Sequence, residues 1–416
     1  MGEREPGVSR TAGDTRPSGR TSALRLTLST PLYRSATIAL FLSGLGISAA
    51  APQIARFLVT DLNSSLPTAG LFYLTNLTAP VAGYLVGARS DRTGGRLGLF
   101  RLCAVAGFLG WVGIAFSTQL WMPFAISAAV LGFAGASTSQ LFAAIHDEAS
   151  LHPNQANDGV VAIVRMALTA GWVVGPVAGS FLAAETSLRT MLIATGLCTL
   201  AQIVPLGSLR TSRPAEHAHA AHHRRPRLTA MMPLLAFTAL YVLVYAGEPI
   251  KYAYLPIYMN EELRLAPALS GAIIGIQPLV EILLMPLCVI VARRTGMIRL
   301  MIVAAGLGVA ANICFATTGT AAGLLLGQVL MGGVWAIFMI LGIIVAQRLL
   351  PTAVATASAI FMSSNALSSA LGGLAGGLGV ATAGLPLVFL IPAAFALIAM
   401  AGLTIMDRST GRSLKL

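Results

Sequence analysis

Two charged residues lie within long apolar segments of this chain, where a charge is costly. Arg165 falls in the segment 158–183, and Glu281 falls in the segment 267–292. At the centre of a membrane-spanning helix a charged side chain costs about 2.5–3.5 kcal/mol on insertion scales, and such residues often belong to proton relays. We therefore expect Arg165 and Glu281 to pair in one conformational state and to separate in another, with a proton on Glu281 coupled to the change. The alternative is a permanent ion pair that only stabilises the fold.

A second charged group lies in the segment 230–258. Tyr241, Tyr245, Glu248 and Tyr252 share one helical face there, and Lys251 follows Glu248 by three residues and can neutralise it. Such a face suits a sugar, because aromatic rings stack on its CH groups while polar groups bond to its hydroxyls. Tyrosines also gather at membrane interfaces, so the pattern has a purely structural alternative.

Polar and aromatic residues in other apolar segments extend this candidate substrate cavity. Their amide groups both donate and accept hydrogen bonds, as sugar hydroxyls require, and one tryptophan offers a stacking surface. The set consists of Asn76, Gln140, Gln277, Gln328, Trp335 and Asn365. Each of them can instead bridge two helices.

The composition identifies the elements that must position these residues. The chain has 416 residues, of which 56% are hydrophobic and 10% charged, with a mean hydropathy of +0.79. Soluble domains carry about 25% charged residues, so we expect an all-α membrane protein. A spanning helix needs about 20 apolar residues. Twelve segments qualify: 32–57, 67–88, 97–118, 121–145, 158–183, 187–208, 230–258, 267–292, 297–318, 321–347, 352–381 and 384–406.

The distribution of arginine predicts how these helices are oriented. Basic residues are concentrated in the two tails and in alternate loops, and the remaining loops contain only Arg56, Arg189 and Arg264. Because cytoplasmic loops carry the excess of basic residues, we place both termini in the cytoplasm, which requires an even number of spans. The net charge of +12 is then expected to face anionic membrane lipid and does not indicate a nucleic-acid partner.

The chain is expected to form two bundles of six helices, residues 30–208 and 229–406. A polar and basic cytoplasmic linker, 209–228, divides them, and the polar segments 1–29 and 407–416 are expected to be cytoplasmic tails, the first of them disordered. A weak repeat supports this division: Ala88-Arg89 and Arg92-Thr93-Gly94 recur as Ala292-Arg293 and Arg294-Thr295-Gly296. Parallel repeats of this kind are typical of secondary transporters, which bind substrate near the midplane between them.

A charged segment between the second and third apolar segments contains Gly87, Asp91, Arg92, Gly94 and Arg96. We expect a short cytoplasmic gating loop, in which Gly87 allows close helix packing and Asp91 caps a neighbouring helix. The two arginines are expected to pair with Asp147 and Glu148 at the end of the fourth helix. The alternative is a basic loop that only sets the topology.

Two glycine patterns predict close helix packing. Gly171, Gly175 and Gly179 recur every four residues in the fifth segment and form one smooth face, while Pro176 removes a backbone hydrogen bond and is expected to kink the helix. The glycine-rich stretch 372–379 lies within the eleventh apolar segment. We interpret it as a surface packed against the second helix and not as a phosphate-binding loop.

These patterns resemble the major facilitator superfamily. The order Gly-x-x-x-Asp-Arg-x-Gly-x-Arg, from Gly87 to Arg96, resembles its loop between helices 2 and 3, and the segment from Gly171 to Gly179 resembles the helix 5 motif of its antiporters. The resemblance implies two pseudo-symmetric six-helix bundles, a loop that latches the cytoplasmic side closed, and export. Gly95 stands where a basic residue is common, which implies a weaker latch.

A closer similarity is to the bacterial sugar efflux transporter (Set) family. It rests on Leu71-Phe72-Tyr73-Leu74-Thr75-Asn76, Ser139-Gln140-Leu141-Phe142-Ala143, Val164-Arg165-Met166, Trp172-Val173-Val174-Gly175-Pro176 and Leu279-Val280-Glu281-Ile282. This resemblance covers helices 1 to 12 and implies proton-linked export of small sugars or glycosides. The segment Gly247-Glu248-Pro249-Ile250-Lys251-Tyr252 departs from the family pattern, which leaves the choice of sugar open.

The sequence contains no catalytic set, ATP-binding loop or metal-ligand spacing, so we expect a transporter with no cofactor and no metal, and not an enzyme. The four cysteines lie in apolar segments and are interpreted as core residues. We expect a monomer in the plasma membrane of a bacterium, with sugar, protons and lipid as its partners. Two alternatives stay open: a proton-coupled exporter of drugs or amphiphiles with the same fold, and a membrane receptor or scaffold that transports nothing.

Overall fold

The computed structural model describes residues 22–151, 157–209 and 228–410. Within these ranges, twelve helical stretches are long and apolar enough to cross a membrane. They are Pro31–Thr60, Leu66–Thr93, Arg96–Ala115, Trp121–Leu151, Gly159–Glu185, Leu188–Leu206, Thr229–Glu262, Pro267–Cys288, Met297–Thr317, Ala321–Leu349, Thr356–Ala383 and Leu387–Ser409. The predicted all-helical fold with twelve spans is therefore confirmed.

Short breaks divide several spans into separate helices. The helices before residue 209 are α1 (Ala23–Ser29), α2 (Pro31–Ala50), α3 (Ile54–Thr60), α4 (Leu66–Leu71), η1 (Phe72–Thr78), α5 (Ala79–Thr93), α6 (Arg96–Ala115), α7 (Trp121–Ile126), α8 (Gly132–Leu151), α9 (Asn157–Glu185) and α10 (Leu188–Ala201). Those after residue 227 are α11 (Leu228–Tyr245), α12 (Gly247–Ile257), α13 (Pro267–Thr295), α14 (Met297–Thr317), α15 (Ala321–Leu349), α16 (Val354–Ala383) and α17 (Leu390–Thr410). Proline explains the break between α11 and α12, because Pro249 has no N–H to donate to Tyr245, where α11 ends.

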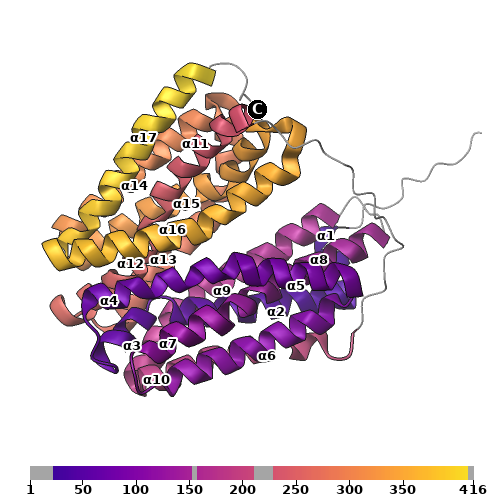
Figure 1. The fold of residues 1–416 in the computed structure, drawn as a ribbon, viewed down its shortest axis with the longest axis horizontal. Coiled ribbons are helices and arrows are strands. Elements are labelled where there is room, and N and C mark those ends of the chain that lie inside the picture. Colours follow the sequence, from indigo (N-terminus) through magenta and orange to yellow (C-terminus); the bar gives the residue numbers. More distant parts are fainter. Residues whose placement is uncertain (1–21, 152–156, 210–227, 411–416) are drawn as a thin grey trace, which may run out of the picture.

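The helices form two groups that diverge toward one side of the molecule (Figure 1). In the first group, α1 to α10, α2 packs against α9 and α10, and α6 packs against α8 and α10. In the second group, α11 to α17, α14 packs against α15 and α17, and α13 packs against α15. Helix α1 and the end of α17 lie where the groups diverge (Figure 1). We call this the terminal side and the opposite one the far side.

The two groups meet on the far side. Helices α3, α4 and η1 and the later part of α9 contact α12, α13 and α16 there. One hydrophobic core contains side chains of both groups, among them Phe57, Phe72, Tyr254 and Ile273. Toward the terminal side, each group has a separate core of its own. The structure therefore describes a conformation that is closed on the far side.

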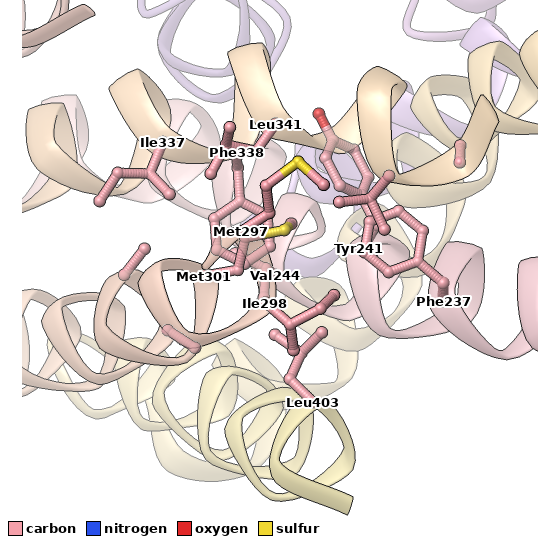
Figure 2. Packing of buried hydrophobic residues seen from close by; sticks show 14 of the residues in the cluster. Phe237, Tyr241, Val244, Met297, Ile298, Met301, Ile337, Phe338, Leu341 and Leu403 are labelled. Carbon is pink, nitrogen blue, oxygen red and sulfur yellow. The ribbon is translucent and has the colours of Figure 1, made fainter. Parts of the chain in front are cut away.

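Figure 2 shows the core of the second group near the terminal side. Phe237 and Tyr241 of α11 lie beside Phe338 of α15 and Met297 of α14 in this core. The ring of Tyr241 meets that of Phe361 with centroids 4.6 Å apart. The aromatic face predicted for the seventh span thus begins in the core, because Tyr241 is only 5% exposed.

The tails differ in part from the sequence prediction. Residues 23–29, expected within a disordered tail, form helix α1, which packs against α9. Ser22 caps this helix by accepting a hydrogen bond from the Arg25 N–H at 3.2 Å. Helix α17 extends to Thr410, beyond the expected end of the last span. Residues 1–21, 210–227 and 411–416, which hold most of the predicted tails and linker, lie outside the described residues.

Candidate functional site

The break in the seventh span places a carboxylate and an ammonium group inside the second helix group. Glu248 lies in the first turn of α12, and Lys251 lies one turn later on the same face. Gln277 of α13 and Trp335 of α15 face them from neighbouring helices. Each of these four residues is no more than 6% exposed. We call them the buried polar cluster.

Hydrogen bonds connect every member of the buried polar cluster. The Lys251 ammonium donates to both carboxylate oxygens of Glu248 at 2.8 Å and also to the Gln277 carbonyl oxygen. The Trp335 indole N–H donates to Glu248 Oε1, and the Gln277 amide donates to the same oxygen at 3.4 Å. A buried ion pair needs this kind of complete bonding, because otherwise desolvation of the two charges exceeds their attraction.

Aromatic rings surround the cluster on two sides. Tyr245 meets Trp335 edge to face, with ring centroids 4.4 Å apart. The Lys251 ammonium lies 4.7 Å from the ring centre of Tyr252. That ring packs against the ring of Trp172 of α9, with the two ring centroids 6.3 Å apart. Trp172 belongs to the first group, so this aromatic contact joins the two groups. Polar groups beside flat apolar rings match the two kinds of surface that a sugar presents.

Glu281 lies on α13 one helical turn after Gln277, and is partly exposed. Among the described residues it has neither a hydrogen bond nor an ion pair, although it interacts electrostatically with Lys251 and Tyr245. Arg165 is exposed on α9, and its guanidinium lies 5.5 Å from the ring centre of Phe142. The two residues are therefore unpaired in this conformation.

The other predicted amide residues form no hydrogen bond with the buried polar cluster among the described residues. Asn76 of η1 donates a hydrogen bond to Ser369 of α16 at 3.3 Å and so joins the two groups. Asn365, one turn before Ser369, is exposed. Gln140 and Gln328 are buried, and Gln328 is 0% exposed with no partner for either amide atom among the described residues. Of the residues predicted to line the substrate cavity, Glu248, Lys251, Gln277 and Trp335 thus bond to one another, and the role of the whole set in binding substrate stays a prediction.

A tight junction closes the far side between the second, seventh and eleventh spans. Tyr254 of α12 is completely buried, and its hydroxyl donates to the Leu66 carbonyl oxygen of α4 at 3.3 Å. A Cβ atom added at Gly70 would collide with this hydroxyl and would lie 3.4 Å from the Gly373 carbonyl oxygen. Gly377 similarly faces the Pro67 carbonyl oxygen. We call Gly70, Tyr254, Gly373 and Gly377 the far-side seal.

The glycine-rich stretch of α16 lies between two helices. Gly373 and Gly377 approach the second span, as the sequence predicted, whereas Gly372 and Gly376 approach Pro249 and Ile250 of α12. One pair of glycines thus brings α16 close to the first group, and the other pair brings it close to α12 of its own group. Sequence reasoning identified this stretch but missed Gly70 and Tyr254, because a lone glycine and a lone tyrosine give no periodic signal.

The predicted gating loop is mostly helix. Helix α5 continues to Thr93 and ends at Gly94, whose φ of 63° requires glycine at this helix end. Arg96 bonds to Asp147 at 2.9 Å and to Asp91 at 2.7 Å. Asp91 therefore pairs with an arginine and does not cap a helix. The pairing expected for Arg92 is absent among the described residues, where this side chain is exposed.

The expected close packing at Gly87 is also absent in the part of the chain that the structure describes, where no atom lies within 4 Å of a Cβ built there. The glycine face of α9 does pack closely. Cβ atoms added at Gly171, Gly175 or Gly179 would collide with α2, near Leu45 and Ala49. Pro176 lies inside α9, and its carbonyl oxygen faces Gly271 of α13.

Twelve spans in two groups, an interface closed on one side and a buried polar cluster inside the second group are the architecture of a membrane transporter. The chain belongs to the Major Facilitator Superfamily, whose family model matches residues 36–320 and 237–415. It is accordingly a transporter and not an enzyme.

Known proteins resemble the chain along most of its length. A Deinococcus radiodurans protein to which sugar efflux is provisionally assigned is 27% identical, over 87% of this chain and 95% of that protein. Sugar efflux transporter A of Escherichia coli is 26% identical, over 67% of this chain and 71% of that protein. A variant of the nucleoside transporter NupG has a similar fold, with a TM-score of 0.80 over 90% of this chain and 99% of NupG at 17% identity.

Proposed function

We propose that this protein exports small sugars or glycosides in exchange for protons, by exposing one site alternately to the two sides of the membrane. The observation that carries the proposal is the buried polar cluster beside the rings of Tyr245, Tyr252 and Trp172. The similarity to sugar efflux transporters supports the same substrate class.

Glu248 and Lys251 are the residues best suited to bind sugar hydroxyls. A carboxylate accepts hydrogen bonds from hydroxyl groups, and an ammonium donates to them. In the present conformation these two groups are saturated by each other, Gln277 and Trp335. A sugar must therefore replace bonds within the cluster, which favours a substrate with several hydroxyl groups over a hydrophobic drug.

Glu281 is the proposed proton carrier. Away from the ends of the spans, it is the carboxylate that lacks a partner among the described residues, and it lies within one helical turn of the buried polar cluster. Arg165 of the first group is the proposed partner of ionised Glu281 in the conformation that is closed on the terminal side. The absence of this pair here fits a conformation that is open on the terminal side.

The terminal side is the proposed cytoplasmic side. The excess of arginine in the tails and in the loops of this side supports that orientation. In this arrangement the present conformation receives sugar from the cytoplasm, and the basic residues face anionic lipid. We propose a monomer in a bacterial plasma membrane, because each chain contains both helix groups.

Transport of radiolabelled lactose and glucose by the purified protein in proteoliposomes tests the proposal. We expect an imposed proton gradient to drive sugar against its own gradient and opposite to the protons. Glu281→Gln should retain exchange of sugar for sugar but lose gradient-driven accumulation, because a neutral amide carries no proton. Glu248→Gln should bind sugar more weakly, because a neutral amide accepts weaker hydrogen bonds than a carboxylate does.

Arg299→Gln is the matched control, because it breaks an ion pair with Asp407 outside the site, where the arginine side chain is 68% exposed. It should transport like the unmodified protein. Absence of lactose and glucose flux from a folded protein would contradict the sugar substrate. Flux of a hydrophobic cation in that case would favour the drug-exporter alternative, and absence of both would favour a receptor or scaffold.

A further inference from the structure

We propose that Lys251 changes partners between Glu248 and Glu281, and that this exchange makes sugar binding expel a proton. The inference rests on the proposed exchange of sugar for protons and assigns its coupling step to one side chain.

The charges of the second group do not balance. Away from the ends of its spans, this group contains two carboxylates, Glu248 and Glu281, but one basic side chain, Lys251. A carboxylate within a membrane span and without a cation is costly, even where its side chain is partly exposed as that of Glu281 is. The acid that is paired with the Lys251 ammonium can therefore stay ionised, whereas the other acid must carry a proton. If the ammonium moves to the protonated acid, that acid loses its proton.

The geometry places Lys251 within reach of both acids. Its ammonium bonds to Glu248 on its own helix and to Gln277 on α13. Glu281 follows Gln277 by four residues, so the two side chains are neighbours on one face of α13, about 5–6 Å apart at Cβ. Rotation of the flexible lysine stem, with Gln277 as a common anchor, is sufficient to move the ammonium from one carboxylate to the other.

The other titratable groups around this position are tyrosines. Tyr245 and Tyr252 lie on the same span as Lys251, and Tyr73 of η1 faces Tyr252 from the first group. Tyr241 lies one turn before Tyr245 and stacks on it at 5.8 Å. Phenols stay neutral near physiological pH. They therefore leave the balance among the two acids and the lysine unchanged.

The exchange proceeds in balanced steps. Sugar hydroxyls donate to Glu248 and replace the bonds from Lys251, which keeps its proton and moves to Glu281. The O–H bond of the Glu281 carboxyl breaks, its proton passes to water on the open terminal side, and the resulting carboxylate pairs with the ammonium. After sugar leaves on the far side, Lys251 returns to Glu248, Arg165 takes its place beside the ionised Glu281, and Glu281 then takes a proton from that side and releases Arg165. The cycle exchanges one proton for one sugar.

Proton release by the purified protein in detergent tests this step, with lactose as the probe and a pH indicator in weakly buffered solution. The unmodified protein should release about one proton per bound lactose, since binding of two ligands to linked sites is reciprocal. Lys251→Gln should bind lactose more weakly, because an amide donates weaker hydrogen bonds than an ammonium does, and should release no proton on binding. Lys251→Arg keeps the cation and should restore release.

Lys251→Gln leaves Glu248 without its cation and can fail to fold. Glu248→Gln combined with Lys251→Gln removes both charges and is the second variant, in which lactose binding should again release no proton. Arg299→Gln should behave as the unmodified protein does. Release of a full proton by Lys251→Gln or by the double variant, or loss of lactose binding by both of these, would overturn the role of Lys251.

Lactose transport by the unmodified protein tests the exchange separately from the role of Lys251. If a proton gradient drives lactose accumulation by the unmodified protein, while Lys251→Gln and the double variant still release protons, sugar is exchanged for protons but Lys251 is not the coupling element. If the unmodified protein binds lactose and releases no proton, the proposed exchange itself is wrong.

Discussion

The two ends of the interface between the helix groups are built differently, although the second span extends across both. At the far side, Gly70 leaves only enough space for the Tyr254 hydroxyl and the backbone of Gly373. Toward the terminal side, Gly83 and Gly87 of the same span have no atom of the described residues within 4 Å of a Cβ built on them. The second span thus has a glycine in close contact with the second group at its far-side end, and glycines with no neighbouring atom at its terminal-side end.

The polar contacts differ in the same way. At the far side, Tyr254 and Asn76 bond across the two groups, to Leu66 and Ser369. At the terminal side, the bonds of Arg96 to Asp147 and Asp91 stay within the first group. The terminal side can therefore close without breaking these bonds, whereas the far side opens only if its packing is lost. Packing, more than charge, is expected to decide which side is closed.

The largest effect is expected from Gly70→Leu. The new side chain would collide with Tyr254 in the far-side seal, and overpacking of a close-packed site costs about 1–3 kcal/mol. A cost of this size shifts a two-state equilibrium by about 5- to 150-fold, here toward the conformation open on the far side. Labelling of Asn365→Cys, with the four native cysteines replaced by serine, measures the shift with a membrane-impermeant maleimide applied from the terminal side.

Gly87→Leu is the matched control on the same span. The added side chain meets open space in the present conformation but would occupy the position that the second group must approach when the terminal side closes. It should leave labelling of Asn365→Cys undiminished and slow transport. Equal loss of labelling in both variants would contradict the idea that the two ends close in turn.

A smaller effect is expected from the contact between Arg96 and Asp147. Their side chains are 20% and 11% exposed, so water screens this pair less than a surface pair. We expect a coupling energy of about 1 kcal/mol in a double-mutant cycle of Arg96→Gln and Asp147→Asn. Thermal unfolding in detergent measures it. The same cycle with Asp91, whose side chain is 72% exposed, should give a smaller value that added salt removes.

The spans and the family could be predicted from the sequence because they depend on local features. Apolar length defines each span whatever its neighbours are, and the glycine spacing of 171, 175 and 179 creates a smooth face on any helix. The resulting close packing against α2 appears as expected. The helix ends were predicted less well, because α5 continues through charged residues that the hydropathy pattern assigned to a loop.

The candidate site could be predicted only in part, because the contacts between spans are set by tertiary packing. Glu248 and Lys251 are close in sequence, and their pairing follows from helix geometry. Gln277 and Trp335 join them from two other helices, and nothing in the sequence distinguished these residues from Gln140 or Gln328, which are buried elsewhere. The far-side seal was missed because the contacts among its residues depend on which helices cross and at which residues they cross.

The smallest effect is expected from Arg56→Gln, although it removes an ion pair that joins the two groups. At the far side, Arg56 Nε lies 3.7 Å from Glu261 Oε1, and the two side chains are 26% and 53% exposed. Such pairs contribute about 0–1 kcal/mol and are screened by salt. Labelling of Asn365→Cys should therefore change far less than in Gly70→Leu, and not at all at high salt. Arg189→Gln, which breaks a 3.4 Å contact with Asp61 within the first group, is the control. A shift by Arg56→Gln as large as that of Gly70→Leu would mean that charge, and not packing, closes the far side.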